Sequence, residues 1–254
     1  RVSPDGSKVG GHQASSSSVA TLMTSLYFDF MGPGDRISVK PHASPVFHAI
    51  QFLLGKLEPS YLKTLRGFHG LQAYPSRTKD PDPVDFSTGS VGLGAVAPNF
   101  AALVDEYAGT HLYSRSGPGR RYLSLLGDAE LDEGAVWEAI AEPSMADVKN
   151  VLWVVDLNRQ SLDRVIPGIR VQAWRQMFAA NGWRVIDVKY GKRLQAAYEE
   201  PNGELLRYCI DDMSNEVYHR LLRVPLGALR ELLPGFSRDP KVFTKLISQW
   251  DDRE

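Results

Sequence analysis

Residues Tyr122–Asp156 read YLSLLGDAELDEGAVWEAIAEPSMADVKNVLWVVD. The apolar run Tyr122–Leu126 predicts a buried strand. Asn150–Asp156 is short, apolar and rich in β-branched residues, and it predicts a second strand. A helix is predicted between them at Glu130–Glu142. This order of elements predicts an α/β fold, with an open, mainly parallel sheet that has helices on both faces.

The same alternation continues on both sides of this stretch. Further strands are predicted at Arg36–Val39 and Trp183–Lys189. Apolar periodicity and capping residues predict helices at Ser15–Met31, Pro45–Leu54, Ser90–Tyr107, Gln172–Asn181, Arg193–Glu200, Asn215–Arg223 and Asp239–Trp250. A chain of 254 residues is long enough for one domain of this class or for two small ones.

Composition excludes several classes of function. Lys plus Arg is 29 and Asp plus Glu is 30, so the net charge of -1 argues against a nucleic-acid-binding protein. Cys209 is the only cysteine, which excludes a disulfide framework and a zinc site built from cysteines. We therefore expect a reducing compartment, the cytoplasm. The apolar stretch Val19–Met31 contains polar residues and is too short for a membrane span, so no membrane partner is expected.

Polar residues follow the two central strands at their carboxyl ends. Asp128 comes just after the first strand, and Asn158 and Gln160 come just after the second. Parallel neighbouring strands would bring these ends together, where open α/β sheets bind ligands. Carboxylate, amide and carbonyl oxygens suit Mg²⁺ or Ca²⁺, and a helix that begins after Gly127 suits a phosphate. The alternative is that Asp128 is only a helix N-cap and Asn158 only a turn residue.

The segment Gly127-Asp128-Ala129-Glu130, with Asn158 about thirty residues later, resembles the signature of a known family. This is the thiamine diphosphate-dependent superfamily of transketolases and homodimeric pyruvate dehydrogenases. Its signature has glycine where this chain has Ala129, which is also small. The residues from Glu133 to Ala139 resemble the transketolase helix that follows the metal-binding aspartate, and Asp156–Gln160 is similar to the metal-binding turn of homodimeric pyruvate dehydrogenase.

Three earlier segments and one later segment resemble the same superfamily, in its order. Gly10–Ser15 and Lys40–Pro45 resemble its first and second histidine motifs. Thr88–Gly94 resembles its glycine loop. Asp239–Lys241 is similar to a motif before the final helix of pyruvate dehydrogenase catalytic domains.

The resemblance implies a role for each matching residue. Asp128, Asn158 and Gln160 would bind Mg²⁺, and His12 and His42 would transfer protons at the substrate. Glu133 is a candidate for an interface or proton-relay carboxylate, although a favourable charge in the first turn of a helix is an equal alternative. The expected contacts to thiamine diphosphate come from Ser15, Val91, Gly92, Gly127, Ala129, Glu130 and Asn158.

The implied activity is that of an oxidoreductase component, which decarboxylates a 2-oxo acid such as pyruvate with thiamine diphosphate and Mg²⁺. Residues 1–254 would be the diphosphate-binding, N-terminal domain, as a fragment or a separate subunit. The pyrimidine-binding domain is absent from the chain, so a second domain or chain must complete the site. The implied assembly is a homodimer or heterotetramer, with an acyltransferase of a multienzyme complex as a further partner.

Other interpretations stay open. Transketolase-type transfer of two carbons between sugar phosphates is one, and a non-catalytic partner-binding module with this fold is another. A dinucleotide fingerprint fits the letters of Gly92–Ala97, but the preceding segment is too polar for the buried strand that such a fingerprint requires. His69 is a weaker candidate for the same cleft, and Cys209 is expected to be an inert buried thiol.

Overall fold

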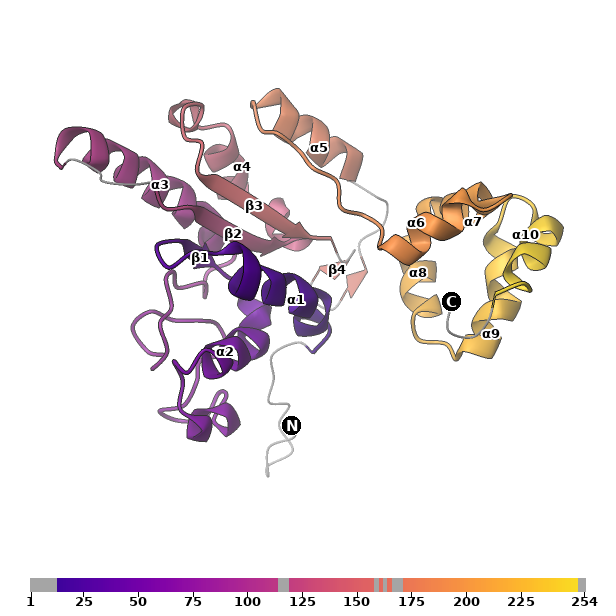
Figure 1. Ribbon diagram of the computed structural model, residues 1–254, viewed down its shortest axis with the longest axis horizontal. Coiled ribbons are helices and arrows are strands. Elements are labelled where there is room, and N and C mark those ends of the chain that lie inside the picture. The colour runs from indigo at the N-terminus through magenta and orange to yellow at the C-terminus, as the bar shows by residue number, and fades with distance from the viewer. Residues whose placement is uncertain (1–12, 114–118, 158–159, 162–163, 166–170, 251–254) are drawn as a thin grey trace. The chain divides into compact units, whose positions relative to one another are not determined.

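In the computed structural model of the protein, a three-stranded parallel sheet forms the centre of the N-terminal half of the chain (Figure 1). Its strands are β1 (Arg36–Ser38), β2 (Tyr122–Gly127) and β3 (Val151–Asp156), in the spatial order β1-β2-β3. Helices pack around this sheet, so the predicted open α/β fold is confirmed. Because all three strands are parallel, their carboxyl ends lie at one edge.

One face of the sheet is covered by α1 (Gln13–Ser25) and α2 (Ser44–Leu53). The chain of α1 continues as a π-helical turn, Leu26–Phe30, so the predicted helix Ser15–Met31 is in fact two elements. Apolar side chains from these helices meet those of β1 and β2, and their removal from water stabilises this layer. The buried core includes Val19, Met23, Leu26, Ile37, Val39, Phe47, Ile50, Leu123 and Leu125.

The opposite face is covered by α3 (Leu93–His111), which lies close to β2. Side chains alternate along a strand, so Ser124 points away from the face of Leu123 and Leu125. Its hydroxyl donates a hydrogen bond of 2.7 Å to the carbonyl of Ala95 in α3. On β3 the indole of Trp153 donates to Asn99 Oδ1 at 2.7 Å. Polar anchors on this face therefore fix the start of α3 above the sheet.

The helix predicted at Glu130–Glu142 begins later than expected. Asp128–Asp132 is a 3₁₀ turn, and α4 spans Gly134–Ile140. Glu133 separates them because its backbone is extended, with φ -82° and ψ 129°. Two further short 3₁₀ turns of this half are Pro59–Lys63 and Pro143–Met145.

A clamp of polar contacts holds the start of β1 against β2. The Asp35 carboxylate accepts hydrogen bonds from the backbone N–H of Arg121 at 2.7 Å and from its Nε at 2.8 Å. The guanidinium of Arg121 also lies 4.1 Å from the centre of the Phe30 ring. The pKa of Asp35 is lowered, because these Arg121 contacts and the Gly32 N–H outweigh the opposing effect of burial.

The C-terminal half contains a short antiparallel pair, β4 (Gln160–Ser161) with β5 (Arg164–Val165), and then helices. These helices are α5 (Val171–Ala180), α6 (Lys192–Glu199), α7 (Gly203–Asp212), α8 (Asn215–Leu221), α9 (Leu226–Leu232) and α10 (Pro240–Ile247). The fully buried Phe243 of α10 packs with Leu206 of α7, Leu246 and Ile247. Helices α7 and α9 were not predicted.

The prediction of a strand at Trp183–Lys189 is wrong. This segment joins α5 to α6 as irregular backbone, and no strand within the described part of the chain pairs with it. Its apolar residues Val185, Ile186 and Val188 are exposed rather than buried. Apolar, β-branched composition favours a strand, but a strand forms only where a partner supplies the hydrogen bonds of its backbone.

The structure describes residues 13–113, 119–157, 160–161, 164–165 and 171–250. The chain divides into two compact units, Arg1–Asn158 and Arg159–Glu254. The assignment of residues 1–254 to one diphosphate-binding domain stays a prediction. Within the described ranges, none of the helices combines the length and apolar character that crossing a membrane requires.

Candidate functional site

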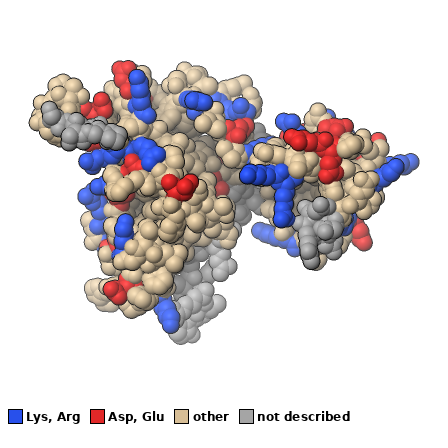
Figure 2. Space-filling view, in the orientation of Figure 1, with Lys and Arg blue, Asp and Glu red and all other residues tan. Residues whose placement is uncertain are grey.

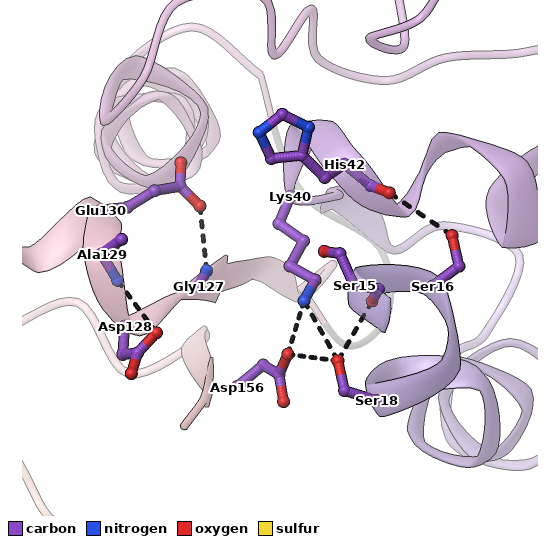
Figure 3. A network of polar contacts seen from close by, with 10 residues as sticks. All are labelled: Ser15, Ser16, Ser18, Lys40, His42, Gly127, Asp128, Ala129, Glu130 and Asp156. Carbon is purple, nitrogen blue, oxygen red and sulfur yellow. Dashed lines mark hydrogen bonds and ion pairs between the residues drawn. The ribbon is translucent and has the colours of Figure 1, made fainter. Parts of the chain in front are cut away.

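The carboxyl ends of β1, β2 and β3 bring together several residues that the sequence singles out (Figure 3). Gly127 at the end of β2 pairs in register with Asp156 at the end of β3. Asp128 follows Gly127 directly, and a 3₁₀ turn that contains His42 follows β1. Parallel sheets bind ligands at this edge, so we treat it as the candidate site.

Lys40 and Asp156 form an ion pair at this edge. Lys40 Nζ lies 2.5 Å from Asp156 Oδ2, and the Lys40 side chain is only 4% exposed. The hydroxyl oxygen of Ser18 lies 2.7 Å from the same carboxylate oxygen and 3.4 Å from Lys40 Nζ. Figure 3 shows this cluster between the start of α1 and the strand ends. The buried ammonium of Lys40, the carboxylate of Asp156 and the hydroxyl of Ser18 thus lie together at this edge of the sheet.

Glu130 connects two loops of the site. Its carboxylate accepts a hydrogen bond from the N–H of Gly127 at 3.0 Å and one from the N–H of Gly92 at 3.4 Å. The side chain is buried, and this burial raises the pKa of Glu130 against the opposing effect of the two N–H donors and Lys40. The turn after β2 is thereby tied to the glycine loop before α3.

The glycine loop reaches the start of α4. Gly92 has φ 83°, and a Cβ at this position would lie 2.9 Å from Glu133 Cβ, so glycine is required on both grounds. The structure therefore places Gly92 beside Glu133, whose side chain is exposed. Val91, the preceding residue, is 50% exposed. A ligand bound at this edge would therefore lie beside the backbone of Gly92 and the half-exposed side chain of Val91.

His42 is held at the same edge by contacts on two sides. Its ring packs edge-on against Tyr74, with 5.5 Å between ring centres, and its carbonyl accepts a hydrogen bond of 3.4 Å from Ser16 Oγ. Ser15, one residue earlier on α1, is partly exposed (Figure 3). His42 and the first turn of α1 therefore lie in contact.

Asp128 is buried, with 2% of its surface exposed, and its Oδ1 accepts a hydrogen bond of 3.1 Å from the N–H of Ala129. His12 and Asn158 lie outside the described residues. Gln160 belongs to β4, but its side chain is also outside the description. The complete metal-ligand set of Asp128, Asn158 and Gln160 thus stays a prediction.

Sequence reasoning missed Lys40 and Asp156. The signals were present, because Lys40 directly precedes Pro41-His42 and Asp156 ends the strongest predicted strand. Their pairing depends on two strands that are distant in the sequence.

Two further residues singled out in the sequence lie elsewhere. His69 is exposed, and its ring packs edge-on against Phe68 with 4.0 Å between the ring centres. Burial raises the pKa of Cys209 to about 11, as expected for an unreactive thiol.

Comparison with known proteins identifies a family. Residues 34–200 match the family described as "Transketolase, thiamine diphosphate binding domain". The chain is 31% identical to the pyruvate dehydrogenase E1 component of Mycolicibacterium smegmatis, an alignment that covers 100% of the chain and 28% of that protein. It is 28% identical to the protein of the same name from Cupriavidus necator, over 96% of the chain and 28% of that protein. The chain thus spans under a third of the length of these relatives.

A solved structure shows the same fold. A transketolase mutant from Pichia stipitis matches with a TM-score of 0.51 and 23% sequence identity, over 61% of this chain and 23% of that one. At this identity the likeness concerns the fold alone.

Proposed function

The chain belongs to the transketolase family of thiamine diphosphate-binding domains, and from this we propose that it forms the diphosphate-binding part of a 2-oxo acid dehydrogenase component. The reaction would be the Mg²⁺-dependent decarboxylation of a pyruvate-like acid. Asp128, Lys40, the turn after β2 and the glycine loop before α3 come together at one edge of the sheet, and this arrangement is the main support for the proposal. The pyruvate dehydrogenase relatives favour this reaction over others of the family.

The residues present fit a magnesium diphosphate. The buried carboxylate of Asp128 offers the hard oxygen ligand that Mg²⁺ prefers. The ammonium of Lys40 offers a charge-assisted contact for a phosphate oxygen. At Gly92 a side chain would overlap Glu133, so the glycine lets this loop pack closely against the segment before α4. The chemistry of this edge therefore matches the group that the family binds.

Each residue has a distinct part in this proposal. Asp128, Asn158 and Gln160 hold the metal. Backbone and side-chain groups of Ser15, Val91, Gly92, Gly127, Ala129 and Glu130 hold or shape the bed of the diphosphate. Bound thiamine diphosphate supplies an electron sink for the decarboxylation. His12 and His42 donate or accept protons at the substrate oxygen, and Glu133 relays protons or contacts the partner half of the site.

A second domain or chain completes the site in this proposal, because it carries the pyrimidine-binding half. The assembly would be a homodimer or heterotetramer, with an acyltransferase as a further partner in a multienzyme complex. The relatives are more than three times as long as this chain, which leaves room for such a half.

Substitution of Asp128 tests the metal site. We expect Asp128→Asn to weaken Mg²⁺-dependent binding of thiamine diphosphate at least about 10-fold, because a metal ligand loses its charge. Calorimetry on the whole protein measures this, with exposed Asp147→Asn as the matched control. Equal affinity in Asp128→Asn and the parent protein contradicts the assignment.

Substitution of His42 tests the reaction. We expect His42→Ala to lower kcat by about 10²-fold with pyruvate, and to change cofactor affinity much less, because general acid–base catalysis contributes on that scale. The matched control is His111→Gln, an exposed histidine on α3. Turnover of sugar phosphates in place of pyruvate would instead support the transketolase reaction. Cofactor binding without either turnover would support a non-catalytic module.

A further inference from the structure

A second cluster of ligand-type side chains lies away from the candidate cofactor site. It consists of His48 on α2 and of Asp80 and Asp82, which lie on the loop between the 3₁₀ turn Pro59–Lys63 and α3. One potential ligand atom from each residue lies within 4.8 Å of the other two. One imidazole and two carboxylates are a donor set that divalent metal ions use.

Burial distinguishes this cluster from an ordinary acidic surface patch. His48 is 2% exposed, and the Asp82 side chain is fully buried. His48 Nδ1 lies 2.7 Å from Asp82 Oδ2. The remaining atoms, His48 Nε2 and Asp82 Oδ1, have no hydrogen-bond partner among the residues that the structure describes. Buried polar atoms are nearly always satisfied, so a water or an ion is the expected partner of these two atoms.

Asp80 is fixed in place by the backbone of its own loop. Its Oδ1 accepts a hydrogen bond from the N–H of Gln72, and its Oδ2 accepts one from the N–H of Ser76, both at 2.7 Å. Each carboxylate oxygen has two acceptor sites, so these bonds leave capacity for a cation. The carboxylate is thus held rigidly, as a metal ligand should be.

Within the three side chains themselves the negative charge exceeds the positive charge, and the nearest cations of the cavity beside Asp82 are Arg36, Arg77 and Arg120. Two carboxylates carry two negative charges, and His48 can supply one positive charge at most. Burial and the negative charges of Asp85 and Asp82 raise the pKa of the Tyr27 hydroxyl. A divalent cation with a neutral imidazole brings the cluster to zero charge, which is how buried charges are normally accommodated.

The cluster lies near the opposite edge of the sheet from Asp128. Asp82 lines a cavity of about 570 Å³ together with Arg36 and Tyr122, which are the first residues of β1 and β2. Asp128 follows the other end of β2, and six residues of strand span about 20 Å. The cluster is therefore separate from the cofactor site.

We propose that His48, Asp80 and Asp82 bind a first-row divalent cation such as Zn²⁺, which fastens α2 to the loop of residues 72–88. The three side chains supply three ligands, and water completes the coordination. The site has a structural role, because it links α2 to this loop away from the cofactor site, and it does not depend on the proposed function.

Zinc binding to the whole protein tests this. The protein is stripped with a chelator and saturated with thiamine diphosphate and Mg²⁺, and Zn²⁺ is then titrated by calorimetry. We expect one Zn²⁺ per chain, with affinity weakened on the order of 100-fold in His48→Gln and Asp82→Asn. The control His111→Gln keeps the parent affinity. Equal affinity in His48→Gln and the parent, or a parent that binds no Zn²⁺, overturns the proposal.

A second measurement needs no variant, in case His48→Gln fails to fold. X-ray absorption at the zinc edge of the loaded parent protein distinguishes imidazole nitrogen from oxygen ligands. We expect one imidazole with oxygen neighbours at about 2.0–2.2 Å. A shell of oxygen alone overturns the proposal. Zn²⁺ should also raise the melting temperature of the parent, because it binds the folded state only.

Discussion

Glu130 shows how a single carboxylate connects sequence, packing and charge. It stands at the third position of the turn after β2 and reaches back to the N–H of Gly127, as acidic residues do at helix starts. Burial raises its pKa, so the folded state holds a proton more readily than the unfolded state does. Ionisation of Glu130 therefore costs more free energy in the folded state than in the unfolded state.

The pH dependence of stability follows from this direction. We expect the parent protein to lose stability relative to Glu130→Gln as pH rises from the ordinary value of 4.5 to the raised pKa, by up to about 1.4 kcal/mol per pH unit. Below this window the difference between the two proteins stays constant. Urea unfolding between pH 4 and 8 measures it, with exposed Glu138→Gln as the control. Parallel curves for parent and Glu130→Gln would refute the assigned direction.

At the scale of elements, the sequence predicts those helices and strands whose own residues show a clear hydrophobic pattern. The sequence predicts β2 and β3 because a short, mostly apolar run of this length is typical of a buried strand. Trp183–Lys189 also contains β-branched residues, but it carries charged residues between them and lacks a partner strand in the described structure. Composition carries no information about partners. The helix α7 was missed although Leu206, Cys209 and Met213 follow helical spacing, because its other residues are polar.

The clamp at the start of β1 gives a prediction at this scale. We expect Asp35→Asn to lower the free energy of unfolding by about 2 kcal/mol at pH 7, because hydrogen bonds to Arg121 lose their charge. The pKa of Asp35 is lowered, so this stabilisation is complete above its ordinary value of 3.8 and is lost as pH falls through the lowered pKa. Chemical denaturation at pH 7 and pH 2 measures both, and the difference should nearly vanish in acid.

Exposed Asp29→Asn, six residues earlier, is the matched control. A loss of stability in Asp35→Asn that is as large at pH 2 as at pH 7 would mean that packing rather than charge holds the clamp.

At the scale of the molecule, the candidate site was predictable in outline. The family resemblance assigns Asp128, Gly92 and His42 to one site, and in the structure Gly127 and the turn after β1 lie at the same edge of the sheet. The ion pair of Lys40 and Asp156 was not predictable, since a lysine is rarely buried unless a distant partner neutralises it. Burial of that kind becomes visible only when the strands are assembled.

The whole-molecule prediction concerns completeness. We expect residues 1–254 alone, with thiamine diphosphate and Mg²⁺, to decarboxylate no pyruvate, because in our proposal the pyrimidine-binding half lies on another domain or chain. An assay of carbon dioxide release, with the whole protein as the positive control, measures this. Turnover by a monomer, shown by light scattering, would contradict this division of the site.

Gly92 packs against Glu133 and donates a hydrogen bond to Glu130, and these two contacts restrict which residues can stand at position 92. A side chain at position 92 would overlap the Cβ of Glu133, and without Glu130 the N–H groups of Gly92 and Gly127 would lose their common acceptor. A smaller residue at position 133 would remove the overlap but not the strain of a positive φ at position 92. In evolutionary terms, a compensating change at position 133 alone therefore does not free position 92 to vary.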